Sequence, residues 1–145
     1  MTLKITKVRE GARIPERATA GSAGLDLCAC IDEPVTVAGR GSAVVGTGIA
    51  IALPGPEYAA FVFARSGLGI KHGIGLLNGV GVIDSDYRGE IRVGLVNQFD
   101  EPYTIEPGER IAQLIVLPVP AVTVETADAL DDTARGAGGF GSSGR

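Results

Sequence analysis

The segment spanning residues 76–92 combines a carboxylate, an aromatic ring and a side-chain amide with several glycines. Asp84 stands where apolar residues give way to a turn-prone stretch, a common place for a catalytic carboxylate on a rigid support. Tyr87 can lie flat against an apolar ring such as a sugar, and Asn78 offers both a donor and an acceptor. Gly79 and Gly81 let main-chain groups approach a planar base. The segment predicts either a ligand-reading hairpin or an ordinary surface hairpin with acidic turn residues.

A second group with chemical potential is Arg65-Ser66-Gly67-Leu68. Ser66 is a favourable N-cap for a single helical turn through about residue 71, before Gly73 ends it. Free N–H groups at the start of a helix, next to an arginine, favour an anion such as phosphate. The alternative interpretation is a capped turn with a surface arginine.

Two polar residues interrupt stretches that otherwise resemble buried strands. Asp26 lies within residues 23–29, and Gln113 lies within residues 108–115. A buried carboxylate without a partner is costly, so Asp26 must be paired. It is either a strand-end acid bonded to backbone N–H groups or an acid near a metal or phosphate site. For Gln113 the simple alternative is an amide satisfied by the backbone.

The C-terminal stretch becomes acidic and then rich in glycine and serine, with Phe140 as its one large apolar residue after position 135. Such a stretch cannot pack by itself. Arg135 can pair with a phosphate, Phe140 can stack on a base, and glycine N–H groups can cradle oxygens. We therefore expect one folded domain over residues 1–126 and a flexible tail over 127–145 that closes over the site as a lid. A flexible terminus or a cloning remnant is the alternative.

The composition limits the classes of protein that remain. With 145 residues and 45% hydrophobic residues, the chain is long enough for one globular domain with a sizeable core. A net charge of −4 argues against a nucleic-acid-coating protein, and two closely spaced cysteines with one histidine leave no disulfide framework or tetrahedral metal site. The N-terminus lacks a signal pattern, and no apolar run approaches the length of a membrane span. We expect a soluble, cytoplasmic protein with no membrane or nucleic-acid partner.

Short runs rich in Val, Ile and Thr, separated by turns containing Gly and Pro, predict an all-β domain. Besides the hairpin, strands are expected at residues 3–8, 23–29, 35–37, 43–53 (broken at its glycines), 58–64, 90–98, 108–115 and 119–125.

Five segments resemble, in order and spacing, the motifs of the homotrimeric dUTP pyrophosphatase (dUTPase) family. Any one of them is a weak signal, but all five together are specific, and the resemblance covers residues 3–145. They are Ala23-Gly24-Leu25-Asp26-Leu27, Arg65-Ser66-Gly67-Leu68, the stretch 78–91, Gly108-Glu109-Arg110-Ile111-Ala112-Gln113-Leu114, and the stretch 135–144.

The resemblance implies an all-β, jelly-roll-like β-barrel with one helical turn near residues 66–71. It also implies hydrolysis of dUTP to dUMP and pyrophosphate, by Mg²⁺-assisted attack of water at the α-phosphorus. Asp84 resembles the carboxylate that orients and deprotonates this water. Asp26 resembles an acid that supports Mg²⁺ through bound water.

The remaining site residues are also implied by the resemblance. Tyr87 resembles the ring that packs under the deoxyribose and leaves no room for a 2′-hydroxyl, and Arg92 borders the substrate. The other positions resemble the uracil-reading main chain with its amide (Asn78, Gly81, Val82, Ile83), the groups that hold the triphosphate and water (Arg65, Ser66, Gly67, Gln113), and the closing tail (Arg135, Phe140, Gly141, Ser142).

The family resemblance further implies a homotrimer whose active sites take the hairpin, the phosphate-binding segment and the tail from different subunits. An apolar C-terminal strand beyond a proline-marked break agrees with such subunit exchange. Two other functions remain open at this point. One is a dCTP deaminase of related fold, alone or bifunctional, and the other is a non-catalytic nucleotide sensor.

Overall fold

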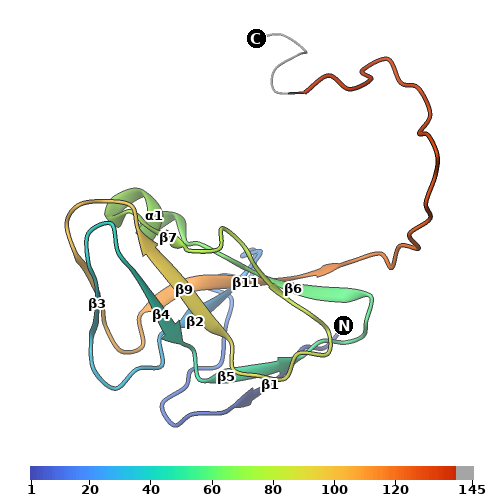
Figure 1. Ribbon diagram of the computed structural model, residues 1–145. Coiled ribbons are helices and arrows are strands. Elements are labelled where there is room, and N and C mark those ends of the chain that lie inside the picture. Colours follow the sequence, from blue (N-terminus) through green and yellow to red (C-terminus); the bar gives the residue numbers. More distant parts are fainter. Residues whose placement is uncertain (140–145) are drawn as a thin grey trace.

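The computed structural model describes residues 1–139, so the predicted tail residues Phe140, Gly141 and Ser142 lie outside the described residues. This part of the chain forms short strands and one short helix (Figure 1). In chain order the elements are β1 (Lys4–Lys7), β2 (Leu25–Cys28), β3 (Val35–Val37), β4 (Ser42–Gly46), β5 (Ile49–Ala52), β6 (Tyr58–Phe63), α1 (Ser66–His72), β7 (Ile74–Leu76), β8 (Gly81–Ile83), β9 (Arg92–Asn97), β10 (Tyr103–Ile105) and β11 (Arg110–Pro118).

Every ladder between these strands is antiparallel. The largest sheet has the order β2-β11-β6-β8, and a second has the order β4-β9-β7. Two smaller sheets pair β1 with β5 and β10 with β3. Within residues 1–139, no helix is long and apolar enough to cross a membrane. The predicted all-β class is confirmed, with one short helix beside the sheets.

Alternating burial along the strands explains why these sequences fold as sheets. In β9 the side chains of Val93, Leu95 and Asn97 are buried while the intervening residues are more exposed. A period of two is the signature of a strand with one face on the core. The core gathers such positions from both large sheets and from β5, among them Leu27, Ile49, Ile74, Leu95, Ile111 and Leu114, all at most 1% exposed.

The helix forms where it is predicted, but its cap is different. Residue Arg65, with extended backbone angles, is the N-cap, and it makes no side-chain capping hydrogen bond. The prediction that Ser66 caps the helix is therefore wrong, because Ser66 is already the first helical residue. Gly73 ends the helix in the left-handed conformation at φ 69°, and its N–H reaches the carbonyl of Gly69 at 3.1 Å.

The predicted hairpin around residues 84–89 is also corrected. Its two arms do not pair with each other, because β8 pairs with β6 whereas β9 pairs with β4 and β7. A turn at Gly79, with φ 72°, separates β7 from β8 and lets the chain change sheets. The polar stretch 84–91 is thus a connection between two sheets.

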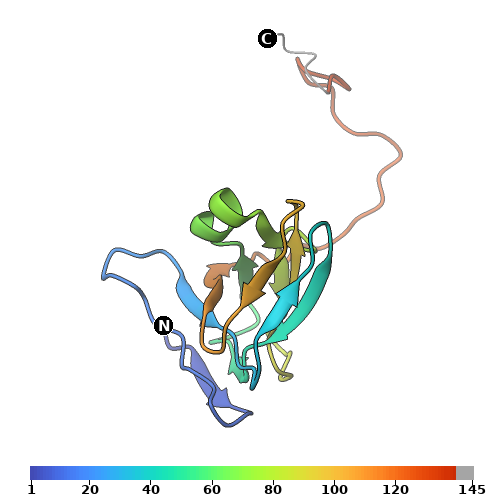
Figure 2. The ribbon, with the colours of Figure 1, turned by 90° about the vertical axis from the view of Figure 1, so that its left-hand side faces the viewer.

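The predicted strand at residues 119–125 is absent from the described chain, in which β11 ends at Pro118. From there the chain runs away from the body, as both views show (Figure 1, Figure 2). Val122 and Val124 are 81% and 90% exposed. A strand needs a neighbour to pair with, and beyond one bond from the Val119 N–H to the Glu57 carbonyl at 2.7 Å this segment pairs with no strand among residues 1–139.

Candidate active site

One pocket, of about 280 Å³, lies where the two large sheets meet at β8 and β9. We call it the β8 pocket. It brings together seven of the residues predicted from the sequence: Asn78, Gly81, Val82, Ile83, Asp84, Tyr87 and Arg92. Its remaining wall is mostly apolar, from Val62, Leu76, Ile91, Val93 and Gly94, with Glu90 as a further polar member.

Strand β8 lies at the edge of its sheet, and this position defines what the pocket can bind. Its one partner is β6, with Gly81 opposite Val62 and Ile83 opposite Ala60. Among residues 1–139, the other edge of β8 therefore carries N–H and C=O groups without a strand partner, which can pair with an added planar ligand. Gly81 also keeps the strand close to β6, since a Cβ there would lie 3.1 Å from the Cβ of Val62.

The turn after β8 holds Asp84 and Tyr87 beside the same pocket. The Tyr87 N–H donates to the Asp84 carbonyl at 3.2 Å, which closes the turn. The Tyr87 hydroxyl donates to the carbonyl of Glu90 at 3.1 Å. Gly89 is required for this ring position, because a Cβ at residue 89 would lie 2.3 Å from the Tyr87 hydroxyl oxygen. The ring and the carboxylate are therefore fixed by one short loop.

Glu90 is a residue that the sequence analysis did not single out. Its carboxylate accepts the Gly48 N–H at 2.8 Å and lies 4.0 Å from the Arg9 guanidinium. A Cβ at Gly46 would lie 2.6 Å from the same carboxylate oxygen, so a glycine makes room for it. Glu90 thus ties the end of the Asp84 loop to the connection between β4 and β5. The signal in the sequence is a lone acid between a glycine and a buried isoleucine.

A second pocket, also of about 280 Å³, lies around Asp26 and is here called the Asp26 pocket. It gathers the other predicted ligand residues of the folded body: Asp26, Arg65, Ser66, Gly67 and Gln113. Ala18, Ser22, Ala23 and Gly24 complete its wall. The first intrahelical bond runs from the Gly69 N–H to the Arg65 carbonyl at 2.9 Å. The N–H groups of Ser66 and Gly67 precede it and are available to an anion.

Strand pairing places the polar residues of this pocket side by side. Gln113 in β11 lies opposite Asp26 in β2 and opposite Phe63 in β6. Its side-chain amide donates to the Ala64 carbonyl at 2.9 Å. The alternative prediction, that the backbone satisfies the Gln113 side chain, is therefore confirmed for its NH₂ group. Its amide oxygen can still accept a hydrogen bond from a ligand.

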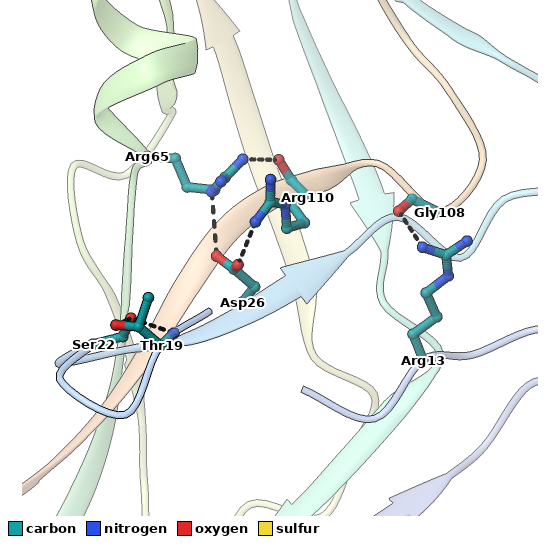
Figure 3. A network of polar contacts seen from close by, with 7 residues as sticks. All are labelled: Arg13, Thr19, Ser22, Asp26, Arg65, Gly108 and Arg110. Carbon is teal, nitrogen blue, oxygen red and sulfur yellow. Dashed lines mark hydrogen bonds and ion pairs between the residues drawn. The ribbon is translucent and has the colours of Figure 1, made fainter. Parts of the chain in front are cut away.

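The Asp26 carboxylate is held between two arginines (Figure 3). One oxygen lies 3.3 Å from Arg65 Nε and the other lies 3.1 Å from Arg110 Nη1. Arg65 also donates from Nη1 to the carbonyl of Arg110 at 3.0 Å. The Asp26 side chain is 19% exposed, so the two ion pairs offset much of the cost of removing it from water.

The two pockets share no lining residue within one chain. Arg135 is not brought to either of them, and its Nε donates to the nearby Gly138 carbonyl at 2.9 Å. No cluster of three or more His, Cys, Asp or Glu residues occurs within residues 1–139. In the Asp26 pocket a divalent cation would find one carboxylate among the lining residues, that of Asp26, and would need most of its ligands from elsewhere.

His72, the one histidine, packs against the ring of Tyr103 with 4.6 Å between ring centroids. The Tyr103 hydroxyl donates to the Glu109 carboxylate at 2.6 Å. Burial, followed by this bond, raises the pKa of Tyr103 to about 12. The group is a structural link between α1 and the loop before β11.

Together, the all-β fold and its pockets define a class: a β-protein with one site suited to a planar ring and another suited to an anion. The sequence model of the dUTPase family matches residues 10–144. The chain is 50% identical to a deoxyuridine 5'-triphosphate nucleotidohydrolase of Idiomarina loihiensis, over 96% of this chain and 92% of that protein. The corresponding protein of Thiobacillus denitrificans is 49% identical, over 100% of this chain and 99% of its own length.

A solved structure gives the same result for the fold. The dUTPase of Staphylococcus bacteriophage 80alpha, determined with dUPNHPP, has a TM-score of 0.89 and 28% identity, with 99% of both chains covered. The chain belongs to the dUTPase family. The predicted family and the predicted jelly-roll-like, all-β fold are thereby confirmed.

Substitution of Gly24 tests whether the position of Gln113 matters for catalysis. A Cβ at residue 24 would lie 2.9 Å from the Gln113 Oε1 and 3.2 Å from its Cβ. The shortest contact is with the end of a flexible side chain, and the Gln113 Cβ needs to shift by only a few tenths of an ångström, so Gly24→Ala should displace the Gln113 amide and leave the fold intact. We expect kcat/KM for dUTP to fall by about tenfold or more, with little change in Tm. Gly21→Ala, where a Cβ meets nothing within 4 Å, is the control. Equal activity of the two variants would contradict the role of Gln113.

Proposed function

We propose that Asp84 directs the water with which this enzyme, a dUTP diphosphatase, hydrolyses dUTP to dUMP and pyrophosphate. The observation that carries the proposal is the unpaired edge of β8, which leads directly into the turn bearing Asp84. A base held on that edge has its sugar and α-phosphate next to the turn. Asp84 is then within reach of a water in line with the α-phosphorus.

Recognition of uracil would rest on main-chain groups of Gly81, Val82 and Ile83, with the Asn78 amide. Uracil and cytosine present inverted donor and acceptor patterns at their ring edges. Fixed backbone groups would therefore lose partners with cytosine, at a cost of roughly 1–3 kcal/mol for each mismatch. Tyr87, whose hydroxyl is held by Glu90, would pack under the deoxyribose and exclude a 2′-hydroxyl. Arg92 borders the same pocket.

The triphosphate would occupy an Asp26 pocket. The N–H groups of Ser66 and Gly67 and the Arg65 guanidinium are donors for phosphate oxygens. The Gln113 amide oxygen would help to hold the attacking water. The N–H groups of Ser66 and Gly67 belong to a helix and the Gln113 amide is bonded to the Ala64 carbonyl, so these groups need little reorganisation when the substrate binds.

Mg²⁺ is the cofactor that we propose, held mainly by phosphate oxygens and waters. A single partly exposed carboxylate fits this arrangement, because Mg²⁺ keeps several waters and takes few protein ligands when phosphates are present. Asp26 would then orient these waters through hydrogen bonds. When bound, the cation would neutralise phosphate charge and make the α-phosphorus easier to attack.

A homotrimer would unite the pieces that one chain keeps apart. The β8 pocket of one subunit would face the Asp26 pocket of a second, and the tail of a third, with Arg135, Phe140, Gly141 and Ser142, would close over both. Two features support this arrangement: the pockets share no residue, and the described chain beyond Pro118 exposes Val122, Val124 and Leu130 by 81–90%. Apolar side chains held this far from their own domain are typical of a segment that packs on another subunit. A cytoplasmic location stays a prediction.

Replacing Asp84, the proposed general base, tests the mechanism directly. Asp84→Asn keeps the shape of the side chain but removes proton acceptance, so pyrophosphate release should fall by about 10²–10⁴-fold. Binding of the non-hydrolysable analogue dUpNHpp should stay close to that of the unmodified enzyme. Asp86→Asn, in the same exposed turn, is the matched control and should remain active. Full turnover by Asp84→Asn would remove this residue from the mechanism.

A substrate panel tests the specificity. The enzyme is incubated with dUTP, dCTP, dTTP and UTP in the presence of Mg²⁺, and the products are identified. We expect dUMP and pyrophosphate from dUTP and little product from the others, because the backbone edge excludes cytosine and the thymine methyl while Tyr87 excludes ribose. Ammonia released from dCTP would instead indicate deaminase activity, and binding without turnover of any nucleotide would indicate a sensor.

The tail is tested by deletion of residues 135–145. Turnover should fall by about 10²-fold or more, because the closing groups are lost. The Tm and the mass of the assembly should hardly change, since the described part of the tail contributes no core residue. Unaltered turnover would show that the tail does not take part in catalysis.

A further inference from the structure

We propose that Arg110 is a positioning residue that neutralises Asp26 from the side opposite the substrate and thereby frees Arg65 for the phosphates. The inference rests on the proposed binding of the triphosphate in the Asp26 pocket. Within one chain, Asp26 has two cationic partners, but only one of them lines that pocket. Arg65 lines it, whereas Arg110 lines the neighbouring hollow formed with Arg13 and Cys28.

A bulge in β11 aims Arg110 at Asp26. The β11–β2 ladder pairs Gln113 with Asp26, and its register then shifts between Arg110 and Ala112. After the shift, Arg110 lies opposite Cys28. Alternate residues of a strand share a face, so Cys28 is on the face of Asp26. The bulge therefore brings Arg110 to the same face as the acid, and re-aiming a side chain is a recurrent use of bulges near active sites.

The burial pattern of β11 agrees with this geometry. Ile111 and Ala112 are consecutive and are 1% and 0% exposed, which breaks the usual alternation of a strand. Both side chains are buried in the core, so the core accommodates the extra residue of the bulge. Without the bulge, Arg110 would lie on the same face of β11 as Ala112, and its guanidinium would point to the apolar core.

The charges explain why a second arginine is needed. A carboxylate at the edge of a triphosphate site repels the phosphates and competes with them for Arg65. With Arg110 at 3.1 Å, Asp26 keeps a cationic partner when Arg65 turns to the ligand. The Arg110 carbonyl, which accepts from Arg65 Nη1 at 3.0 Å, holds one terminal nitrogen of that guanidinium near the pocket.

Arg110→Gln, made in the full chain, tests this role by ligand binding without catalysis. Affinities for dUpNHpp and for dUMP are measured in EDTA, so that no divalent cation contributes. Because Asp26 then retains Arg65, binding of dUpNHpp should weaken by about tenfold, while binding of dUMP changes far less. Arg13→Gln is the matched control from the same hollow. Arg13 donates to the Gly108 carbonyl at 3.2 Å, and the variant should bind both ligands like the unmodified enzyme.

A second substitution separates positioning from a merely structural role. Adding Asp26→Asn to Arg110→Gln removes the charge that sequesters Arg65, so the affinity for dUpNHpp in EDTA should return to that of Asp26→Asn alone. Arg110→Lys, which keeps the charge, should lose less affinity than Arg110→Gln. Arg110→Met keeps the apolar stem and replaces the Gln variant if that variant fails to fold.

Two results would overturn the inference on Arg110 but not the proposed function. One is unchanged binding of dUpNHpp by the Gln or Met variant, and the other is an equal loss of dUpNHpp affinity with and without the carboxylate at residue 26. Failure of the unmodified chain to bind dUpNHpp even with Mg²⁺ present would overturn the proposed function, and this inference with it.

Discussion

Strand β11 pairs along both of its edges, and both pockets depend on this double pairing. On one edge it meets β2, which carries Asp26, and on the other it meets β6, which leads to Arg65. The same β6 carries β8 on its far side. Backbone groups in a sheet interior must be paired because an unpaired buried N–H or C=O is costly. The ladder therefore fixes the relative positions of residues that are distant in the sequence.

The proposed recognition relies on the parts that the ladder leaves incomplete. The outer edge of β8 carries main-chain groups without a strand partner, and the chain beyond Pro118 exposes apolar residues. In an isolated chain both features are costs. In the proposed trimer with its substrate, the base would complete the edge of β8 and a neighbouring subunit would cover the apolar segment. Binding and assembly would thus both satisfy groups that the isolated chain leaves unpaired or exposed.

Much of the site could be predicted from the sequence because its residues break local patterns. Asp26 and Gln113 are polar positions in otherwise apolar strands, and they lie opposite each other across the β2–β11 ladder. Where the sequence interpretation was wrong, the missing information was tertiary. The segment 119–125 has the composition of a strand but no strand partner in the described part of the chain. The two arms of the expected hairpin pair instead with strands of two different sheets.

Arg110 and Glu90 were not singled out for a similar reason. Nothing in the residue types shows that β11 contains a bulge, and without the bulge Arg110 would lie on the wrong face. Nor does the sequence show that Glu90 receives the Gly48 N–H, a contact across 42 positions. Both roles depend on strand register, and register is decided by how the two sheets fit together.

By itself, the sequence determined the all-β class and the family, and it supplied the residues proposed for binding and reaction, because these depend on residue type, order and local periodicity. Only the tertiary structure decided that those residues divide between two pockets, that Asp26 is shared by two arginines, and that β8 offers a free edge. Such features arise from pairing between distant strands, whose energetics no local stretch of the chain contains.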